Sequence, residues 1–200
     1  MDNPIKIFVL GDCGCGKTNI IQRIAGGDFY PNSPSTLSPE SITSRMMIDK
    51  KLYNLQIWDS GGGQKRFRNS KKIFIKNSDI IILIYDITCV ETFDDIYYWF
   101  QYIREISDYD PIICIFGNKI DLMQEKEINN KEMCDFAESR GIKLKFVSAK
   151  ENHQLILDYL KELVLDYLKK INKISQKIYD YEIKKFTRNY IGLLGKYYNY

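Results

Sequence analysis

Short apolar runs alternate along this chain with longer stretches in which apolar positions recur at helical spacing. The apolar runs occupy residues 6–10, 52–58, 80–86, 112–118 and 143–148. Several of them are apolar throughout, as expected for strands that are covered on both faces. The helical stretches occupy residues 17–25, 92–107, 130–140 and 153–171. This alternation predicts an α/β domain in which a mostly parallel sheet has helices on both faces.

The loops that follow the strands contain the candidate binding and catalytic residues. In open α/β sheets, ligands bind where the carboxyl ends of the strands meet the loops. Residues 29–40, FYPNSPSTLSPE, contain three prolines and several hydroxyl side chains, which excludes a regular element. A polar loop of this length inside a compact domain usually has a function.

Residues 11–18, GDCGCGKT, match the phosphate-binding pattern G-x-x-x-x-G-K-[ST] between a predicted strand and a predicted helix. In this pattern the glycines let backbone N–H groups surround phosphate oxygens beside the positive end of the helix. Lys17 reaches the terminal phosphates, and the hydroxyl of Thr18 is a Mg²⁺ ligand. The predicted phosphate-binding residues are Gly11, Asp12, Cys13, Gly14, Cys15, Gly16, Lys17 and Thr18.

Two further motifs indicate which base is bound. NKID follows the fourth apolar run, and SAK follows the last one. The carboxylate of Asp121 can accept hydrogen bonds from N1–H and the exocyclic amine of guanine, a pattern that adenine lacks. A backbone N–H of SAK is positioned to meet the guanine O6. The predicted base-binding residues are Asn118, Lys119, Asp121, Leu122, Ser148, Ala149 and Lys150.

The segments LQIWDS, KRFR, IYDIT, GNKIDL and SAK, together with the phosphate loop, resemble those of the small Ras-like GTPases and, among these, of the Rab family. The resemblance covers residue 5 to about residue 170. It implies a three-layer P-loop NTPase fold with six strands, one of them an antiparallel edge strand. It also implies a GTP/GDP-binding switch that uses Mg²⁺, acts in vesicle trafficking, and has protein effectors, exchange factors and activating factors as partners.

The resemblance assigns roles to three residues outside these motifs. Phe29 corresponds to the aromatic residue that packs across the guanine, although it could also be an ordinary core residue. Thr36 corresponds to the threonine that binds Mg²⁺ and meets the γ-phosphate, and Asp59 to the acid that holds the metal through water. The predicted metal ligands are therefore Thr18, Thr36 and Asp59. Cys13 is expected to lie beside the γ-phosphate without acting as a nucleophile.

The segment DSGGGQ, residues 59–64, has one glycine more than the family pattern. If the insertion follows Gly62, this glycine keeps its amide on the γ-phosphate, Gly63 takes the water-orienting position, and Gln64 is displaced. If the loop bulges earlier, Gly63 takes the amide role and Gln64 stays catalytic. The sequence allows both placements. The predicted catalytic residues are Lys17, Gly63 and Gln64, and we expect slow GTP hydrolysis; the alternative is a non-hydrolysing, nucleotide-bound interaction protein.

The surface expected to contact effectors also departs from the family. Ser38 replaces the usual glycine and Ser41 replaces a phenylalanine, whereas Trp58 and Phe74 keep two of three aromatic positions. These two aromatics could equally be core residues. We therefore expect standard Rab effectors to bind poorly.

The distribution of charge separates a body from a tail. Residues 169–200 have a net charge of +6 and the rest of the chain −3. We expect a G domain at 1–170 and a basic, aromatic, partly helical tail at 171–200. Such a tail suits an anionic membrane surface; packing on its own domain or on a second copy suits it equally well. No nucleic-acid-binding module is visible, so no nucleic acid partner is expected.

Cysteine usage and the apolar runs suggest the compartment. The five cysteines are not in the paired spacing of a zinc site, which favours reduced thiols in a cytoplasmic protein. We find no signal-peptide pattern and no window near the roughly 18 apolar residues of a spanning helix. The final residues, GLLGKYYNY, contain no cysteine for prenylation. Either the sequence is truncated, or peripheral attachment to intracellular membranes uses other means.

Overall fold

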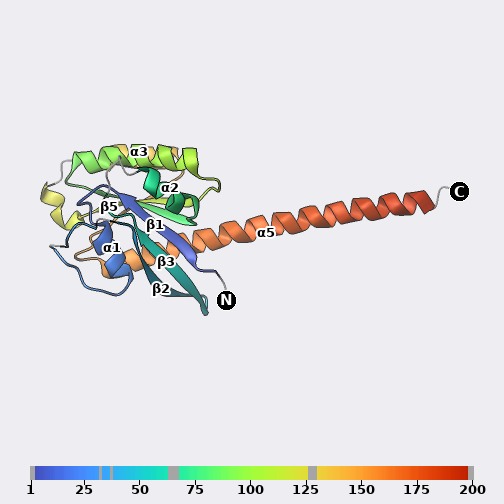
Figure 1. The fold of residues 1–200 in the computed structure, drawn as a ribbon, viewed down its shortest axis with the longest axis horizontal. Helices are drawn as coiled ribbons and strands as arrows, with labels where there is room; N and C mark the ends of the chain where they lie inside the picture. Colours follow the sequence, from blue (N-terminus) through green and yellow to red (C-terminus); the bar gives the residue numbers. More distant parts are fainter. Residues whose placement is uncertain (1–2, 32, 37, 63–67, 126–129, 198–200) are drawn as a thin grey trace. The chain divides into compact units, whose positions relative to one another are not determined.

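The structure, a computed structural model, describes residues 3–31, 33–36, 38–62, 68–125 and 130–197. Six strands form one sheet in the order β2-β3-β1-β4-β5-β6 (Figure 1). The strands are β1 (Ile5–Gly11), β2 (Glu40–Ile48), β3 (Lys51–Asp59), β4 (Ile80–Asp86), β5 (Ile112–Asn118) and β6 (Lys143–Phe146). The edge strand β2 is antiparallel to β3, and the other neighbouring pairs are parallel. The predicted sheet is confirmed.

Side chains that alternate along the central strands build two cores. Phe8 of β1, Leu83 of β4 and Ile115 of β5 belong to a cluster with residues of α2, α3 and α4. Their neighbours along the strands point to the other face, where Phe116 packs against Tyr159 at a ring-centroid distance of 6.3 Å. Because both faces are covered, every residue of β4 is buried. This explains why β4 is apolar almost throughout.

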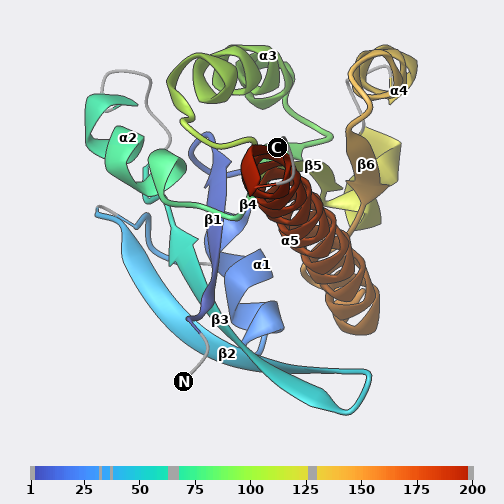
Figure 2. The same cartoon turned by 90° about the vertical axis from the view of Figure 1, so that its right-hand side faces the viewer.

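The described residues contain five α-helices and a short 3₁₀ helix besides the strands. They are α1 (Lys17–Ile24), α2 (Arg68–Lys76), α3 (Val90–Ile106), η2 (Ile120–Glu125), α4 (Asn130–Ser139) and α5 (His153–Tyr197). Figure 2 shows α3 and α1 on opposite sides of the sheet. None of the helices in the described part of the chain is long and apolar enough to cross a membrane.

Among the strands and α-helices, β2 and α2 escaped prediction from the hydrophobic pattern. Every second residue from Ser41 to Met47 of the edge strand β2 is exposed, so its sequence contains no continuous apolar run. The helix α2 has nine residues, RNSKKIFIK, and its apolar positions are confined to the second half. A short element with a polar first turn gives only a weak periodic signal.

The chain separates into two compact units, residues 1–164 and 165–200, and α5 has residues in both. Within the first unit, Ile156, Leu160 and Val164 of α5 are buried. The boundary expected at residue 170 stays a prediction.

Candidate nucleotide-binding site

A pocket of about 340 Å³ opens where the carboxyl ends of the strands meet the loops. Many of the residues predicted from sequence line it: Cys13, Gly14, Gly16, Lys17, Thr18, Phe29, Thr36, Asp59, Gly62, Asn118, Lys119, Asp121, Leu122, Ala149 and Lys150. They come from the β1–α1 loop, the 29–36 loop, the end of β3 and the loops after β5 and β6. The predicted phosphate-binding, base-binding and metal-binding groups therefore share one cavity.

The phosphate loop turns sharply into α1 at a glycine. Gly16 has a φ of +93°, and a Cβ there would lie 2.3 Å from Nδ2 of Asn118. Both the left-handed backbone and the close approach of Asn118 exclude a side chain at this position. Lys17 follows at the first position of α1, where it is 6% exposed and its Nζ donates a 2.8 Å hydrogen bond to the carbonyl oxygen of Asp12. The positive end of α1 and the ammonium of Lys17 thus lie at the same end of the pocket.

Three oxygen-bearing side chains from distant segments meet beside this loop. The hydroxyl of Thr18 donates to Oδ2 of Asp59 at 2.5 Å and lies 2.9 Å from the hydroxyl of Thr36. Asp59 is 5% exposed. Two hydroxyls and one carboxylate form a hard oxygen donor set, which suits Mg²⁺ when waters and phosphate oxygens complete the coordination. Elsewhere in the described ranges, no cluster of three His, Cys, Asp or Glu side chains could hold a metal.

The glycine-rich segment after β3 lies against the 29–36 loop and the residues that follow it. Gly61 has a φ of +68°, and a Cβ there would lie 3.1 Å from the carbonyl group of Ser38. The N–H of Gly61 donates to Oδ1 of Asp59 at 3.0 Å, and the N–H of Gly62 donates to the carbonyl oxygen of Thr36 at 2.8 Å. Sequence reasoning gave Gly61 no role, although the run of three glycines was the available signal.

The two residues on which the insertion question depends, Gly63 and Gln64, lie outside the described residues. Their catalytic roles stay predictions, as does the placement of the extra glycine.

The base-binding motifs are tied to each other and to the phosphate loop by side-chain hydrogen bonds. Nδ2 of the buried Asn118 donates to the carbonyl oxygen of Cys15 at 2.9 Å, and its Oδ1 accepts from the N–H of Ala149 at 3.1 Å. The hydroxyl of Ser148 donates to Oδ1 of Asp121 at 2.6 Å. Asn118 and Ser148 therefore join three separate segments behind the pocket, which fixes the direction of the Asp121 carboxylate.

Some predicted residues lie behind the lining. Gly11, Cys15 and Ser148 are buried, and Asp12 is half-buried. Burial raises the pKa of the Cys15 thiol, so it remains protonated and serves as a packing residue. Through its backbone carbonyl it also accepts the hydrogen bond from Asn118 described above.

Asp86, which sequence reasoning did not single out, orients a residue of the base-binding motif. Its carboxylate is 2.6 Å from Nζ of Lys119, and Asp86 is 5% exposed. The N–H and the hydroxyl of Thr88 both donate to Oδ1 of Asp86. Lys119 also has a φ of 69°, a backbone conformation that non-glycine residues seldom adopt. The available signal in the sequence was the segment IYDIT, which spans the end of β4 at Asp86. Asp86 pairs there with Asn118, the first residue of NKID and the last of β5.

Two other predictions concern aromatic residues. Phe29 lines the pocket and is half-buried, in agreement with a stacking position. Asn19 of α1 accepts from the N–H of Tyr30 and donates to its carbonyl, which anchors the loop next to Phe29. Trp58 and Phe74 are half-buried with ring centroids 4.9 Å apart, so each is both a packing and a surface residue.

These features define a P-loop nucleotide-binding protein of the α/β class. The model of the Ras family matches residues 6–171. The chain is 35% identical over 161 residues to the Ras-related protein Rab-21 of Canis lupus familiaris, covering 79% of this chain and 72% of that protein. It is 34% identical over 142 residues to the Ras-related protein Rab11A of Lotus japonicus, covering 71% and 62% respectively. The chain belongs to the Ras family and is a Rab-related small GTPase.

Proposed function

We propose that this protein is a Mg²⁺-dependent GTP switch with slow hydrolysis. The convergence of the Thr18, Thr36 and Asp59 oxygens beside Lys17, in the same pocket as Asp121, is the observation that supports it best. Membership of the Ras family supports guanine nucleotide binding in general. The loops would become ordered around a γ-phosphate and relax after it is lost, and this change would provide the switch.

In this proposal each residue performs one physical task. Lys17 neutralises charge on the terminal phosphates, and the carboxylate of Asp121 accepts the two donors of guanine. Thr18, Thr36 and Asp59 hold Mg²⁺, either directly or through water, and the ion adds positive charge where phosphate oxygens accumulate negative charge. Binding and orienting the nucleotide account for most of the catalysis expected of this class.

We attribute the slow GTP hydrolysis to the additional glycine before Gln64. Ras hydrolyses GTP unaided at a rate of order 10⁻⁴ s⁻¹, and a helper arginine raises that rate by about 10⁵-fold. If the insertion follows Gly62, it displaces the glutamine by one residue, roughly 3.5 Å of chain, which would remove its contact with the attacking water. A nucleotide-bound interaction protein that does not hydrolyse GTP is the second candidate, and the same glycine favours it.

Single-turnover hydrolysis of bound GTP tests this function. We expect Mg²⁺-dependent release of phosphate from wild type, little change in Gln64→Leu, and faster release when Gly63 is deleted, because the deletion restores the family spacing. Equal, fast hydrolysis by wild type and Gln64→Leu would rule out the slow hydrolysis. Absence of phosphate release with and without a GTPase-activating protein would favour the interaction protein. Preference for ATP in a competition titration would exclude the whole proposal.

The Rab relationship supports a role in membrane trafficking, with effectors and exchange factors as partners, and we extend it to the basic tail. The net charge of +6 in residues 169–200 would attract an anionic membrane surface. Flotation with vesicles of anionic or neutral lipid, at low and high salt, would compare the full chain with residues 1–170. Binding that requires both the tail and anionic lipid supports peripheral attachment through the tail; tail-independent binding excludes that role of the tail.

A further inference from the structure

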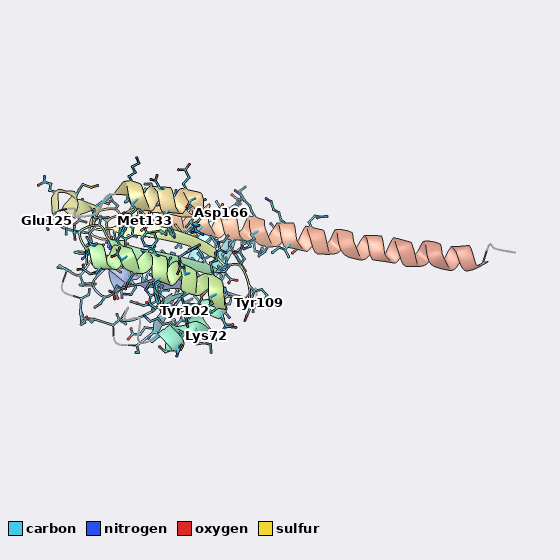
Figure 3. All side chains as sticks on the ribbon, turned by 90° about the horizontal axis from the view of Figure 1, so that it is seen from above. Lys72, Tyr102, Tyr109, Glu125, Met133 and Asp166 are labelled. Atoms are coloured by element: carbon cyan, nitrogen blue, oxygen red, sulfur yellow. The ribbon has the colours of Figure 1, made fainter. Side chains whose placement is uncertain are left out.

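A lysine is buried beneath the glycine-rich segment that follows β3. Lys71 of α2 is 2% exposed, whereas its neighbour Lys72, labelled in Figure 3, is exposed. Nζ of Lys71 donates a 2.7 Å hydrogen bond to the carbonyl oxygen of Gly62. Burying an ammonium is unfavourable unless its surroundings compensate for the lost water. The position of this lysine therefore demands a specific explanation.

The surroundings of Lys71 connect it electrostatically to the nucleotide pocket. Its Nζ lies 5.2 Å from the centre of the Trp99 ring on α3, a distance that suits a cation–π contact. Burial and, to a smaller extent, the charge of Lys17 lower the pKa of Lys71 to about 8, although Asp12 and Asp59 oppose the shift. Lys71 therefore responds to the charges of the phosphate loop and of the candidate metal site, and it is mostly cationic at neutral pH.

A continuous series of contacts leads from Lys71 to the other nucleotide-facing loop. Gly62 uses both of its backbone groups, because its carbonyl accepts from Lys71 and its N–H donates to the carbonyl oxygen of Thr36. The hydroxyl of Thr36 in turn lies 2.9 Å from that of Thr18. Gly62 thus joins the 29–36 loop to α2.

We infer that Lys71 is a positioning residue that couples the two nucleotide-facing loops and favours the triphosphate over the diphosphate. The inference rests on the proposed GTP-binding function. By holding the Gly62 carbonyl, the ammonium keeps the Gly62 N–H directed at the loop that contains Thr36. A γ-phosphate brings additional negative charge to the end of the pocket at which Lys17 lies, and a nearby buried cation interacts with it through a medium of low dielectric constant. GDP lacks this charge.

A ligand shifts a conformational equilibrium only through a difference in its affinity for the two states. Lys71 supplies such a difference. Without its ammonium, the Gly62 carbonyl loses a charge-assisted hydrogen bond and the loops lose the link between them. We expect this to weaken GTP binding and to leave GDP binding nearly unchanged, because the guanine and the first two phosphates contact other residues.

Affinities for GDP and for the hydrolysis-resistant analogue GTPγS test the inference. They would be measured at pH 7 with saturating Mg²⁺ by displacement of a fluorescent guanine nucleotide. We expect Lys71→Met to weaken GTPγS binding about tenfold, as for loss of one charge-assisted hydrogen bond, and GDP binding by less than about twofold. Lys72→Met, the exposed neighbour, should change neither affinity. Lys71→Arg, which keeps the cation, should recover part of the GTPγS affinity.

The outcomes separate this inference from the function on which it rests. If wild type binds both nucleotides and Lys71→Met has the same ratio of affinities as wild type, the inference fails alone. If wild type binds neither nucleotide, both the inference and the proposed function fail. Should Lys71→Met not fold, acetylation of the wild-type amines, followed by mass spectrometry, supplies the answer. Lys71 should react more slowly with GTPγS bound than with GDP bound, relative to Lys72 in the same sample; equal relative rates overturn the inference.

Discussion

The two ends of the nucleotide pocket are built differently. At the end assigned to the base, buried Asn118 and Ser148 join three segments of the chain through side-chain hydrogen bonds, and Asp86 anchors Lys119. At the end assigned to the terminal phosphate, the loops meet mainly through the hydroxyls of Thr18 and Thr36 and through Gly62, whose N–H donates to Thr36 and whose carbonyl accepts from Lys71. Thr18, Thr36 and Gly62 are only half-buried.

This difference indicates how recognition of the base and the response to the terminal phosphate can be separated within one pocket. A base site that is bonded into the fold selects the same base whichever nucleotide is present. Loops that are held by a few bonds can change when one phosphate is lost, because little other structure must break with them. Substitutions at the base end should therefore affect both nucleotides equally, and substitutions at the phosphate end should affect mainly GTP.

The largest effect is expected from removing the carboxylate of Asp121. Two charge-assisted hydrogen bonds to guanine contribute about 4 kcal/mol together, so Asp121→Ala should weaken GDP and GTPγS alike by about 10³-fold. Competition titration against a fluorescent guanine nucleotide measures both affinities. Glu125→Ala, an exposed acid on the same 3₁₀ helix, is the control and should have no effect. A loss confined to GTPγS would contradict the division of the pocket.

A smaller effect is expected from Asn118, which connects the segments at the base end. Asn118→Ala leaves the carbonyl of Cys15 and the N–H of Ala149 without a buried partner. This should lower the free energy of unfolding of the GDP-bound protein by about 3 kcal/mol. Urea denaturation gives this value, and exposed Asn77→Ala should change it by less than about 0.5 kcal/mol. Full stability of Asn118→Ala would show that the base end is not cross-linked as described.

A substitution of Gly61 tests whether changes at the phosphate end affect mainly the triphosphate. An alanine at its φ of +68° is strained, and its Cβ would press on Ser38. We expect Gly61→Ala to weaken GTPγS binding about tenfold and GDP binding much less. Gly141 has a similar φ of +63° with open space around it, so Gly141→Ala carries the same backbone strain away from the loops. If both variants shift the ratio of the two affinities, strain alone explains the effect.

The sequence singled out motif residues that line both ends of the pocket, for a physical reason. Strands such as β1 and β4 are buried on both faces, and the motifs that follow β1, β5 and β6 lie at fixed distances from them. Fixed spacing also brought Thr36 to Thr18 and Asp59, as the Ras-like resemblance implied. These contacts join distant segments, and they could be expected only because the resemblance fixes the spacing of these residues from the phosphate loop.

Contacts between side chains from separate elements were not predictable in the same way. Lys71 stands in RNSKKIFIK, where two adjacent lysines predict two solvated side chains. Only the packing of α2 on α3 decides that Lys71 is buried and Lys72 exposed. Asp86 likewise gains its partner because β4 and β5 are neighbours, with Asp86 in register with Asn118. Tertiary placement gives such residues their roles.

The pH dependence of stability tests the buried charge of Lys71 and should show the smallest effect. Below about pH 8 this lysine is protonated in both the folded and the unfolded protein. Between about pH 8 and its ordinary pKa of 10.5, the folded protein has released the proton and the unfolded chain retains it. Since the unfolded state then binds more protons, the free energy of unfolding rises with pH in this window.

We expect the unfolding free energy of wild type minus that of Lys71→Met, with GDP saturating, to rise by about 1 kcal/mol between roughly pH 7.5 and pH 9. Taking the difference removes the pH dependence that the two proteins share and leaves the part that depends on Lys71, on which Lys17, Asp12 and Asp59 act. The same subtraction with Lys72→Met should give no slope, because Lys72 is exposed in the folded protein. A flat difference for Lys71→Met would mean that its ammonium is solvated in the folded protein, which would contradict its burial against the Gly62 carbonyl at the phosphate end of the pocket.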